Sequence, residues 1–185
     1  MIWQTRISWL TTHKISSINL DSGISSKSRF DICDNDVEFQ NALKTNKMSH
    51  AYMFSGPRGT GKTTIVHAII NLYQKLNNDS ATLLNEIALL APTGRAAKRL
   101  KETTLMPSQT IHKFLGYMGG NKFTYNKYNK TSARLIIIDE ASMMDLSLAH
   151  RLFTSMHDDA RVIIVGDVDQ LPSVGPGQVL KDLIN

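Results

Sequence analysis

The chain alternates short apolar runs with longer amphipathic stretches over most of its 185 residues. Unbroken apolar runs of four or five residues occur at 51–54, 87–91, 135–138 and 162–165. Unbroken runs of this length are typical of strands that are buried on both faces of a sheet. Apolar residues with helical spacing follow the first run, at 65–76. This order predicts an α/β fold with a mainly parallel sheet and helices on both faces.

Shorter patterns fill the remaining segments. Four further helices are predicted. Their ranges are 37–47, 96 to about 102, 110–115 and about 146–156. The segment 119–132 is rich in Asn, Lys, Tyr and Gly, which predicts an exposed loop or a pair of short hairpin strands. Residues 1–36 scatter Ser, Thr and Asp among single apolar residues, which predicts a poorly ordered or weakly structured leader. Residues 37–185 are therefore interpreted as one domain.

The segment 56–63 reads Gly-Pro-Arg-Gly-Thr-Gly-Lys-Thr and lies between the first apolar run and the first helical pattern. It matches a phosphate loop, in which backbone N–H groups hold a polyphosphate at the N-terminus of the following helix. Lys62 is expected to reach the β and γ phosphates, and the Thr63 hydroxyl to bind Mg²⁺. A glycine-rich turn without a ligand is the alternative, which the flanking strand and helix disfavour. The predicted nucleotide-binding residues are Gly56, Pro57, Arg58, Gly59, Thr60, Gly61, Lys62, Thr63 and Thr64.

Two acids, Asp139 and Glu140, directly follow the run Leu135–Ile138. Ligands of parallel sheets bind outside the carboxyl ends of the strands, so these acids are expected beside the phosphate loop. Asp139 is predicted to bind Mg²⁺, and Glu140 to orient and deprotonate the attacking water. Adjacent acids after a strand are common on protein surfaces and would mean little alone. With the catalytic lysine Lys62 they predict hydrolysis of a nucleotide.

Asp167 and Gln170 follow the apolar run 162–165. An amide in this position can hydrogen-bond both the γ phosphate and the metal-bound water, which makes Gln170 a candidate catalytic and nucleotide-binding residue. The alternative is a turn built from Gly, Asp and Pro. The position at a strand end favours a function for both residues.

A candidate nucleic-acid interface follows the apolar run 87–91. Thr93, Gly94 and Arg95 begin a predicted helix, an arrangement that suits a backbone phosphate. Thr110 and His112 are expected to contact the same strand of nucleic acid. A solvated helix face with an ordinary histidine is the alternative, and spacing alone leaves the two interpretations open.

Composition narrows the class of protein only slightly. The net charge of +5 favours an anionic partner, although charge alone is weak support. Cys33 is the only cysteine, so neither an internal disulfide framework nor a cysteine-based zinc site is expected. The first residues contain no apolar signal core, and no run approaches the ~18 apolar residues that span a bilayer. A cytoplasmic protein without a membrane segment is predicted.

Four segments, at 91–100, 110–116, 138–143 and 165–177, resemble successive motifs of the RecD-like branch of superfamily 1 DNA helicases. They begin with Ala-Pro-Thr-Gly-Arg and end with Val-Gly-Asp-Val-Asp-Gln-Leu-Pro-Ser-Val-Gly-Pro-Gly. The resemblance implies a RecA-like P-loop NTPase domain, part of an ATP-driven motor that moves 5′ to 3′ on single-stranded DNA in repair and recombination. It assigns Lys62, Thr63, Asp139, Glu140 and Gln170 to ATP and Mg²⁺, and the segments 93–95 and 110–112 to DNA.

The phosphate loop departs from this family, which usually has Gly-Gly-Pro-Gly-Thr-Gly-Lys-Thr, because Pro57 precedes Arg58 here. The segment 50–64 instead resembles the gamma/tau subunit of bacterial clamp loaders. That family carries cysteines after the loop for a zinc site, and this chain has none after Cys33. Because segment 50–64 supports a clamp-loader ATPase subunit and the missing cysteines count against it, this family is kept only as the alternative.

The chain ends soon after the third helicase motif, so the family's second motor domain, with its arginine finger, is expected to be absent. An arginine finger can contribute several orders of magnitude in rate. We therefore expect the chain to bind ATP, to hydrolyse it slowly and to unwind no duplex alone. Two alternatives stay open: a second chain supplies the missing motor domain, or the chain is a non-catalytic nucleotide- or DNA-binding remnant.

Overall fold

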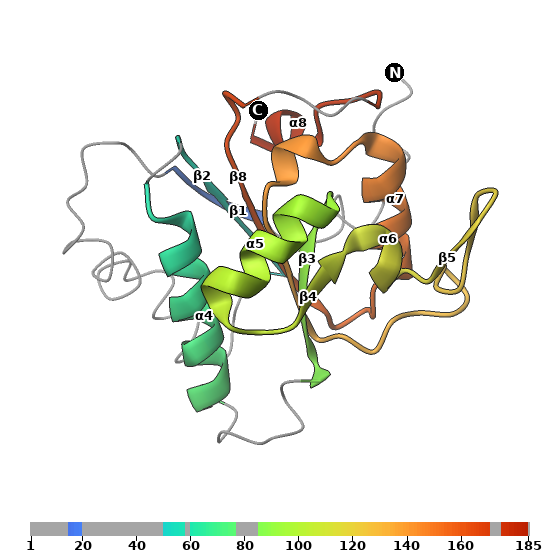
Figure 1. Ribbon diagram of the computed structural model, residues 1–185, viewed down its shortest axis with the longest axis horizontal. Helices are drawn as coiled ribbons and strands as arrows, with labels where there is room; N and C mark the ends of the chain where they lie inside the picture. The colour runs from blue at the N-terminus through green and yellow to red at the C-terminus, as the bar shows by residue number, and fades with distance from the viewer. Residues whose placement is uncertain (1–14, 20–49, 58–59, 77–84, 171–174, 185) are drawn as a thin grey trace.

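A six-stranded sheet forms the centre of the computed structural model, which describes residues 15–19, 50–57, 60–76, 85–170 and 175–184 (Figure 1). The strands lie in the order β1-β2-β8-β7-β3-β4, and every neighbouring pair is parallel. The predicted parallel sheet is thus confirmed. The strand bounds are Ile15–Asn19 (β1), Ala51–Ser55 (β2), Ile87–Ala91 (β3), Ser108–Thr110 (β4), Leu135–Ile138 (β7) and Arg161–Gly166 (β8).

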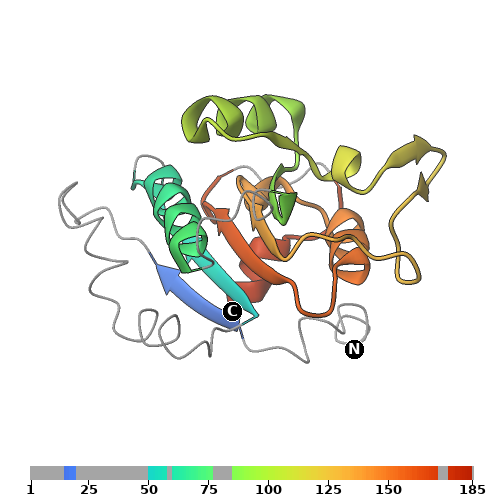
Figure 2. The same ribbon diagram turned by 90° about the horizontal axis from the view of Figure 1, so that it is seen from below.

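Helices cover both faces of the sheet, as expected (Figure 2). One face packs against α4 and α5, and the other against α6, α7 and α8. The predicted helix 37–47 lies outside the described residues. No helix in the described part of the chain is both long and apolar enough to cross a membrane. The helix bounds are Lys62–Leu76 (α4), Gly94–Thr104 (α5), Ile111–Phe114 (α6), Leu146–Ser155 (α7) and Val179–Ile184 (α8).

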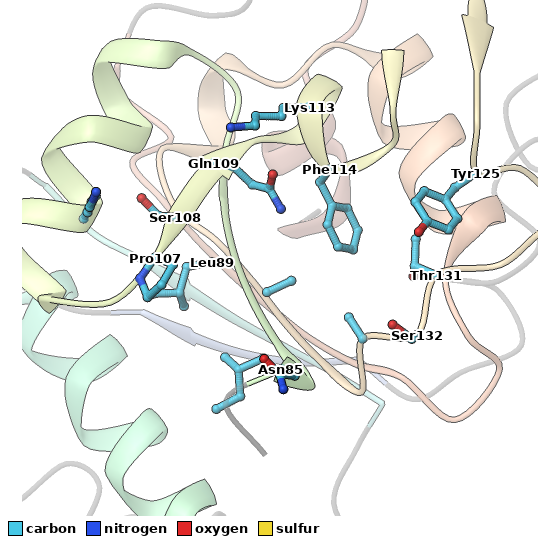
Figure 3. Close-up of a pocket in the computed structure, with 14 residues that line it drawn as sticks. Asn85, Leu89, Pro107, Ser108, Gln109, Lys113, Phe114, Tyr125, Thr131 and Ser132 are labelled. Atoms are coloured by element: carbon cyan, nitrogen blue, oxygen red, sulfur yellow. The ribbon is translucent and has the colours of Figure 1, made fainter. Parts of the chain in front are cut away.

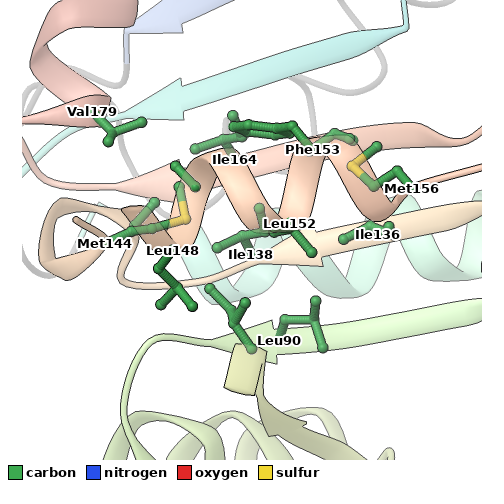
Figure 4. Close-up of a cluster of buried hydrophobic side chains, with 14 of the residues drawn as sticks. Leu90, Ile136, Ile138, Met144, Leu148, Leu152, Phe153, Met156, Ile164 and Val179 are labelled. Carbon is green, nitrogen blue, oxygen red and sulfur yellow. The ribbon is translucent and has the colours of Figure 1, made fainter. Parts of the chain in front are cut away.

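The central strands are apolar throughout because successive side chains point to opposite faces and both faces are covered. In β7, Ile136 and Ile138 join the core under α7, whereas Ile137 joins the core under α4. Leu152 and Phe153 of α7 pack in the first of these cores (Figure 4). Full burial of such a side chain contributes roughly 1.5–3 kcal/mol, so these two layers hold the strand ends in fixed positions.

Strand β1 lies within the segment predicted as a leader and was missed by the sequence analysis. Its residues pair in parallel with β2, with Ile15 opposite Ala51 and Asn19 opposite Ser55. The rest of 1–36 lies outside the described residues, so the leader stays a prediction.

A small hairpin projects from the body of the molecule between α6 and β7 (Figure 1). Its antiparallel strands are β5 (Tyr117–Gly119) and β6 (Lys122–Phe123). The two predictions for 119–132 each hold for a part of it: the hairpin strands lie within 117–123, and residues 124–132 form a loop with turns and one isolated bridge between Asn126 and Asn129. Gly116 precedes the hairpin with φ of 65°, in the left-handed region that favours glycine.

Candidate nucleotide site and nucleic-acid interface

The predicted site residues lie along one edge of the sheet, because the parallel strands end there together. Cross-strand pairs close to the strand ends set this alignment: Ser55 with Gly166, Ile138 with Ile164, Leu90 with Ile138, and Ala91 with Thr110. The phosphate loop, the two acids, Gln170 and the segment 93–95 follow these strands directly. Four segments dispersed in the sequence therefore meet at the carboxyl edge, where ligands of parallel sheets bind.

The phosphate loop is tied to the strand beside it and closed by its own hydrogen bonds. The Gly56 N–H donates to the Gly166 carbonyl of β8 at 3.3 Å. Thr60 donates twice to the Pro57 carbonyl, from its N–H at 3.4 Å and its hydroxyl at 2.8 Å. Gly61 has φ of 82°, which a side chain would strain, and α4 begins at the next residue. Arg58 and Gly59 lie outside the described residues.

Lys62 folds back over the loop at the start of α4. Its ammonium group donates to the carbonyl oxygens of Gly56 at 2.6 Å and Pro57 at 2.7 Å. Thr63 and Thr64 follow in the first turn of the helix, which carries no acidic residue. The positive end of the helix dipole is therefore not neutralised from within α4, an arrangement that favours an anion.

Asp139 lies immediately after β7, and its N–H donates to the Leu90 carbonyl of β3 at 2.9 Å. Burial raises the pKa of its carboxyl group, and the charge of Glu140 adds to this rise. The hydrogen bond from the Glu140 N–H to Asp139 Oδ1, at 2.9 Å, lowers the same pKa, as do the charges of Arg99 and Lys62. Two cations from different helices therefore act on one partly buried carboxylate.

Glu140 adopts the left-handed conformation, with φ of 53° and ψ of 40°. Such a backbone costs of order 1–2 kcal/mol for a residue other than glycine and is found preferentially at functional sites. Its Oε1 lies 3.7 Å from a guanidinium nitrogen of Arg99. Its Oε2 is buried and has no hydrogen-bond partner among the described residues. In the described part of the chain, an acceptor without a donor is thus held at the carboxyl edge.

Gln170 is oriented by Asp167, which is only 4% exposed. The Gln170 side-chain amide donates to Asp167 Oδ2 at 3.2 Å, and the Gln170 N–H donates to the Asp167 carbonyl at 3.3 Å. The Asp169 N–H donates to the other carboxylate oxygen of Asp167 at 3.1 Å. The predicted turn is therefore confirmed, and within it Asp167 fixes the amide of Gln170, whose role at the nucleotide stays a prediction.

The two threonines of the predicted nucleic-acid interface cap helices. Thr93 accepts from the Ala96 N–H at the start of α5, and Thr110 accepts from the Lys113 N–H at the start of α6, both at 3.2 Å. Their hydroxyls satisfy N–H groups that would otherwise lack a partner. Gly94 and Arg95 follow Thr93 and are exposed. The structure therefore offers an open helix start, with Arg95 beside it, at the carboxyl edge.

His112 belongs to an aromatic cluster that the sequence analysis missed. Its exposed ring lies edge-on to Tyr117, with ring centres 5.5 Å apart, and 6.1 Å from Phe123. The guanidinium of Arg151 lies over the Phe123 ring at 4.6 Å. Clusters of exposed rings and cations suit the stacking of unpaired bases. Pairing of the hairpin strands brings Tyr117 and Phe123 together, so no short motif marks this cluster.

A cavity of about 600 Å³ lies elsewhere, beside β3 and β4 (Figure 3). Asn85 and Ser132 line it and precede β3 and β7, so it extends to the amino ends of these strands. The predicted nucleotide-binding residues follow the carboxyl ends of the strands instead. This cavity is therefore separate from the candidate nucleotide site.

The residues at the carboxyl edge fit a magnesium–nucleotide complex. Thr63 offers a hydroxyl and Asp139 a carboxylate, and Mg²⁺ commonly binds one or two protein oxygens together with phosphates and waters. Among the described residues, no group of three or more His, Cys, Asp or Glu side chains could form an all-protein metal site. This donor set is the kind that suits a metal ion entering with a nucleotide.

Comparison with known proteins shows the family to which this chain belongs. The model of the AAA domain matches residues 40–176. The RecD subunit of the RecBCD enzyme from Mycobacterium tuberculosis is 36% identical over 149 residues, which cover 72% of this chain and 26% of the relative. The ATP-dependent RecD2 DNA helicase from Deinococcus radiodurans is 40% identical over 131 residues, or 71% and 17% of the two chains. This chain thus spans about a quarter or less of the relatives' length.

The solved structure of Bacteroides Pif1 bound to single-stranded DNA is 20% identical, with a TM-score of 0.47, over 80% of this chain and 35% of that chain. The parallel sheet, the phosphate loop after β2 and the AAA domain match together define an α/β, RecA-like P-loop fold. The chain therefore belongs to the AAA domain family, and its predicted resemblance to the motor domain of RecD-like superfamily 1 helicases is confirmed.

Proposed function

We propose that this domain binds ATP with Mg²⁺, hydrolyses it and contacts single-stranded DNA, as the first motor domain of a 5′ to 3′ DNA helicase. One observation carries the proposal: Lys62, Asp139 and Glu140 are assembled at one sheet edge, where an acceptor oxygen of Glu140 is buried and has no hydrogen-bond partner among the described residues. Both relatives named above are RecD proteins, and one is an ATP-dependent DNA helicase by name.

The geometry supports a division of roles within the site. Lys62 can exchange the Gly56 and Pro57 carbonyls for phosphate oxygens, because an ammonium group on a flexible stem reorients readily. Glu140 accepts a proton from the attacking water, and its unpaired Oε2 has the capacity to do so. Gln170, held by Asp167, orients the same water. When bound through Thr63 and Asp139, Mg²⁺ supplies positive charge that stabilises the phosphates.

Single-stranded DNA is proposed to cross the start of α5 and the aromatic cluster. Arg95 and the N-terminal N–H groups of α5 suit a backbone phosphate, and the rings of His112 and Tyr117 suit bases. The caps made by Thr93 and Thr110 fix these helix starts and do not themselves require DNA. DNA is therefore expected to meet the backbone of these segments and their cationic and aromatic side chains.

The 185-residue polypeptide corresponds to only part of its relatives, so unwinding is a separate question from ATP binding. Translocation requires two domains that open and close around the nucleotide. We propose that this polypeptide alone hydrolyses ATP slowly and unwinds no duplex, and that another motor domain, in the same or a second chain, completes the enzyme. A cytoplasmic location and a place in DNA repair and recombination remain proposals.

Nucleotide titration of the purified chain tests the site. Wild type is expected to bind ATP with Mg²⁺, and Lys62→Ala to bind at least tenfold more weakly, because a charged hydrogen-bond donor to phosphate is lost. Lys130→Ala is the matched control, since it removes the same charge from a residue that pairs with Asp158 away from the carboxyl edge. No affinity of the wild type for ATP would contradict the proposal.

Hydrolysis is tested with Glu140→Gln in the same chain. This variant should bind ATP as tightly as wild type and lose about 10²–10⁴-fold in kcat, the usual contribution of a general base. Unchanged kcat would remove Glu140 from its proposed role. DNA-stimulated duplex unwinding by the isolated wild type would contradict the proposal that a second motor domain is needed.

A further inference from the structure

Arg99 reaches the carboxyl edge from a helix to which the nucleotide chemistry assigns no part. It lies on the second turn of α5, and its guanidinium nitrogen is 3.7 Å from Glu140 Oε1. The Arg99 side chain is 57% exposed and that of Glu140 is 22% exposed, so the pair lies where the site opens to solvent. Exposed ion pairs contribute little to the stability of a fold. This pair therefore adds little to the stability of the fold.

The two carboxylate oxygens of Glu140 have different surroundings. Oε1 faces Arg99, whereas Oε2 is buried without a hydrogen-bond partner among the described residues. Burial of a carboxylate oxygen without a donor is unfavourable, and rotation of the side chain into water would relieve it. An attraction on Oε1 opposes that rotation. Arg99 is the cation that forms an ion pair with this oxygen in the described part of the chain.

We propose that Arg99 is a positioning residue that holds Glu140 with Oε2 turned into the site. It acts through Glu140 and need not touch the nucleotide. The inference rests on the proposed function, because the role of Glu140 in hydrolysis belongs to that proposal.

The position of Arg99 adds a consequence for DNA. Arg99 and the segment 93–95 belong to the same rigid helix and its cap. A strand of DNA that shifts the start of α5 therefore also shifts the guanidinium that holds Glu140.

Kinetics of three variants of the 185-residue chain test the inference. Arg99→Ala is expected to lower kcat for ATP about tenfold or more, since small misplacements of a catalytic group have effects of this size, and to leave the Kd for ATP within about twofold. Arg99→Lys should recover part of the loss, because an ammonium group preserves the charge. Lys98→Ala should match wild type, since Lys98 is 80% exposed and lies 4.0 Å from Glu102 on the surface of α5.

An unchanged kcat in Arg99→Ala would overturn the inference and leave the proposed function intact. A parallel loss of ATP affinity and kcat/KM, with kcat unchanged, would also overturn it, because Arg99 would then bind the nucleotide directly. Equal losses in Arg99→Ala and Lys98→Ala would have the same meaning, since they would reflect only the net charge of α5.

Hydrogen exchange provides a readout that does not depend on turnover. Without Arg99, Oε2 of Glu140 is expected to leave its buried position, so amides in 139–144 should exchange faster in Arg99→Ala than in wild type or Lys98→Ala. Unchanged exchange there would overturn the inference. If the wild type hydrolyses no ATP but exchange responds to Arg99, the positioning of Glu140 stands and the proposed function fails.

Discussion

The surroundings of Asp139 at the carboxyl edge favour the neutral form of its carboxyl group. Burial raises the pKa of its carboxyl group, and the N–H of Glu140 and the charges of Arg99 and Lys62 only oppose that rise. A folded-state pKa above the unfolded value gives stability that is fully present below the unfolded pKa, about 3.9 for Asp. That stability is lost as the pH rises through the folded pKa. Ionised Asp139 therefore lowers the stability of the domain near neutral pH.

Replacement of Asp139 by Asn should raise the thermal unfolding midpoint at pH 7, because the isosteric amide removes a partly desolvated charge. In a chain of this size each kcal/mol corresponds to about 2–4 °C. The gain should disappear at about pH 3, where the wild-type carboxyl is protonated in both states. Asp169→Asn, at an exposed position, is the control and should leave the midpoint unchanged. A lower midpoint for Asp139→Asn at pH 7 would show that its charge stabilises the fold.

Sequence alone identifies residues that directly follow a buried strand, because that position places them at the carboxyl edge of the sheet. Asp139 and Glu140 follow an unbroken apolar run, so their place at the carboxyl edge can be predicted without a structure. The contact between Arg99 and Glu140 cannot, because it depends on how α5 is rotated about its axis against the sheet. The packing of Tyr117 against Phe123 depends in the same way on the hairpin register.

At the scale of elements, the predictions succeed for the inner strands and fail for the outer ones. The bounds predicted for β3 and β7 match the structure, since both strands are buried on both faces and are apolar throughout. The two strands that were missed, β1 and β4, lie at opposite ends of the sheet order. Their sequences, ISSIN and SQT, are mostly polar. Backbone pairing defines such strands, and it leaves little trace in the hydrophobic pattern.

Gly166 sets how closely the end of β8 approaches α8 and residues 141–142, which follow β7. A Cβ at this position would lie 2.5 Å from a Leu180 methyl group and 3.3 and 3.4 Å from the backbone nitrogens of Ser142 and Ala141. Gly166→Val should therefore lower the free energy of unfolding by about 1–3 kcal/mol, the usual cost of overpacking. It should also weaken ATP binding, because the Gly166 carbonyl accepts from Gly56 in the phosphate loop.

Urea unfolding at constant pH measures the stability effect. Gly94→Ala is the matched control, because a Cβ at Gly94 would meet no heavy atom within 4 Å, and the change should be neutral or stabilise by about 0.4–1 kcal/mol. If Gly166→Val were as stable as Gly94→Ala, the strand ends would have to move apart readily, and the close approach at Gly166 would not constrain the site.

At the scale of the whole molecule, the carboxyl edge divides into two neighbouring regions. The phosphate loop, Gln170 and the acids follow β2, β8 and β7, which are adjacent in the sheet. The candidate DNA-binding segments follow β3 and β4, at the end of the same row. Helix α5 begins in the second region, and its Arg99 reaches the first. One sheet edge can therefore bind both ligands, and the Arg99–Glu140 pair is a direct contact between the two regions.

The salt dependence of DNA binding tests this division. Each phosphate contact to a single strand adds about 0.7 to the slope of log K against log salt concentration. Arg95→Ala should reduce the slope for an oligonucleotide without secondary structure by about that amount and weaken binding similarly for different sequences. Lys130→Ala removes the same charge near the amino end of β7, where it pairs with Asp158, and should leave the slope unchanged. Equal reductions in both variants would mean that the strand responds to net charge and not to the start of α5.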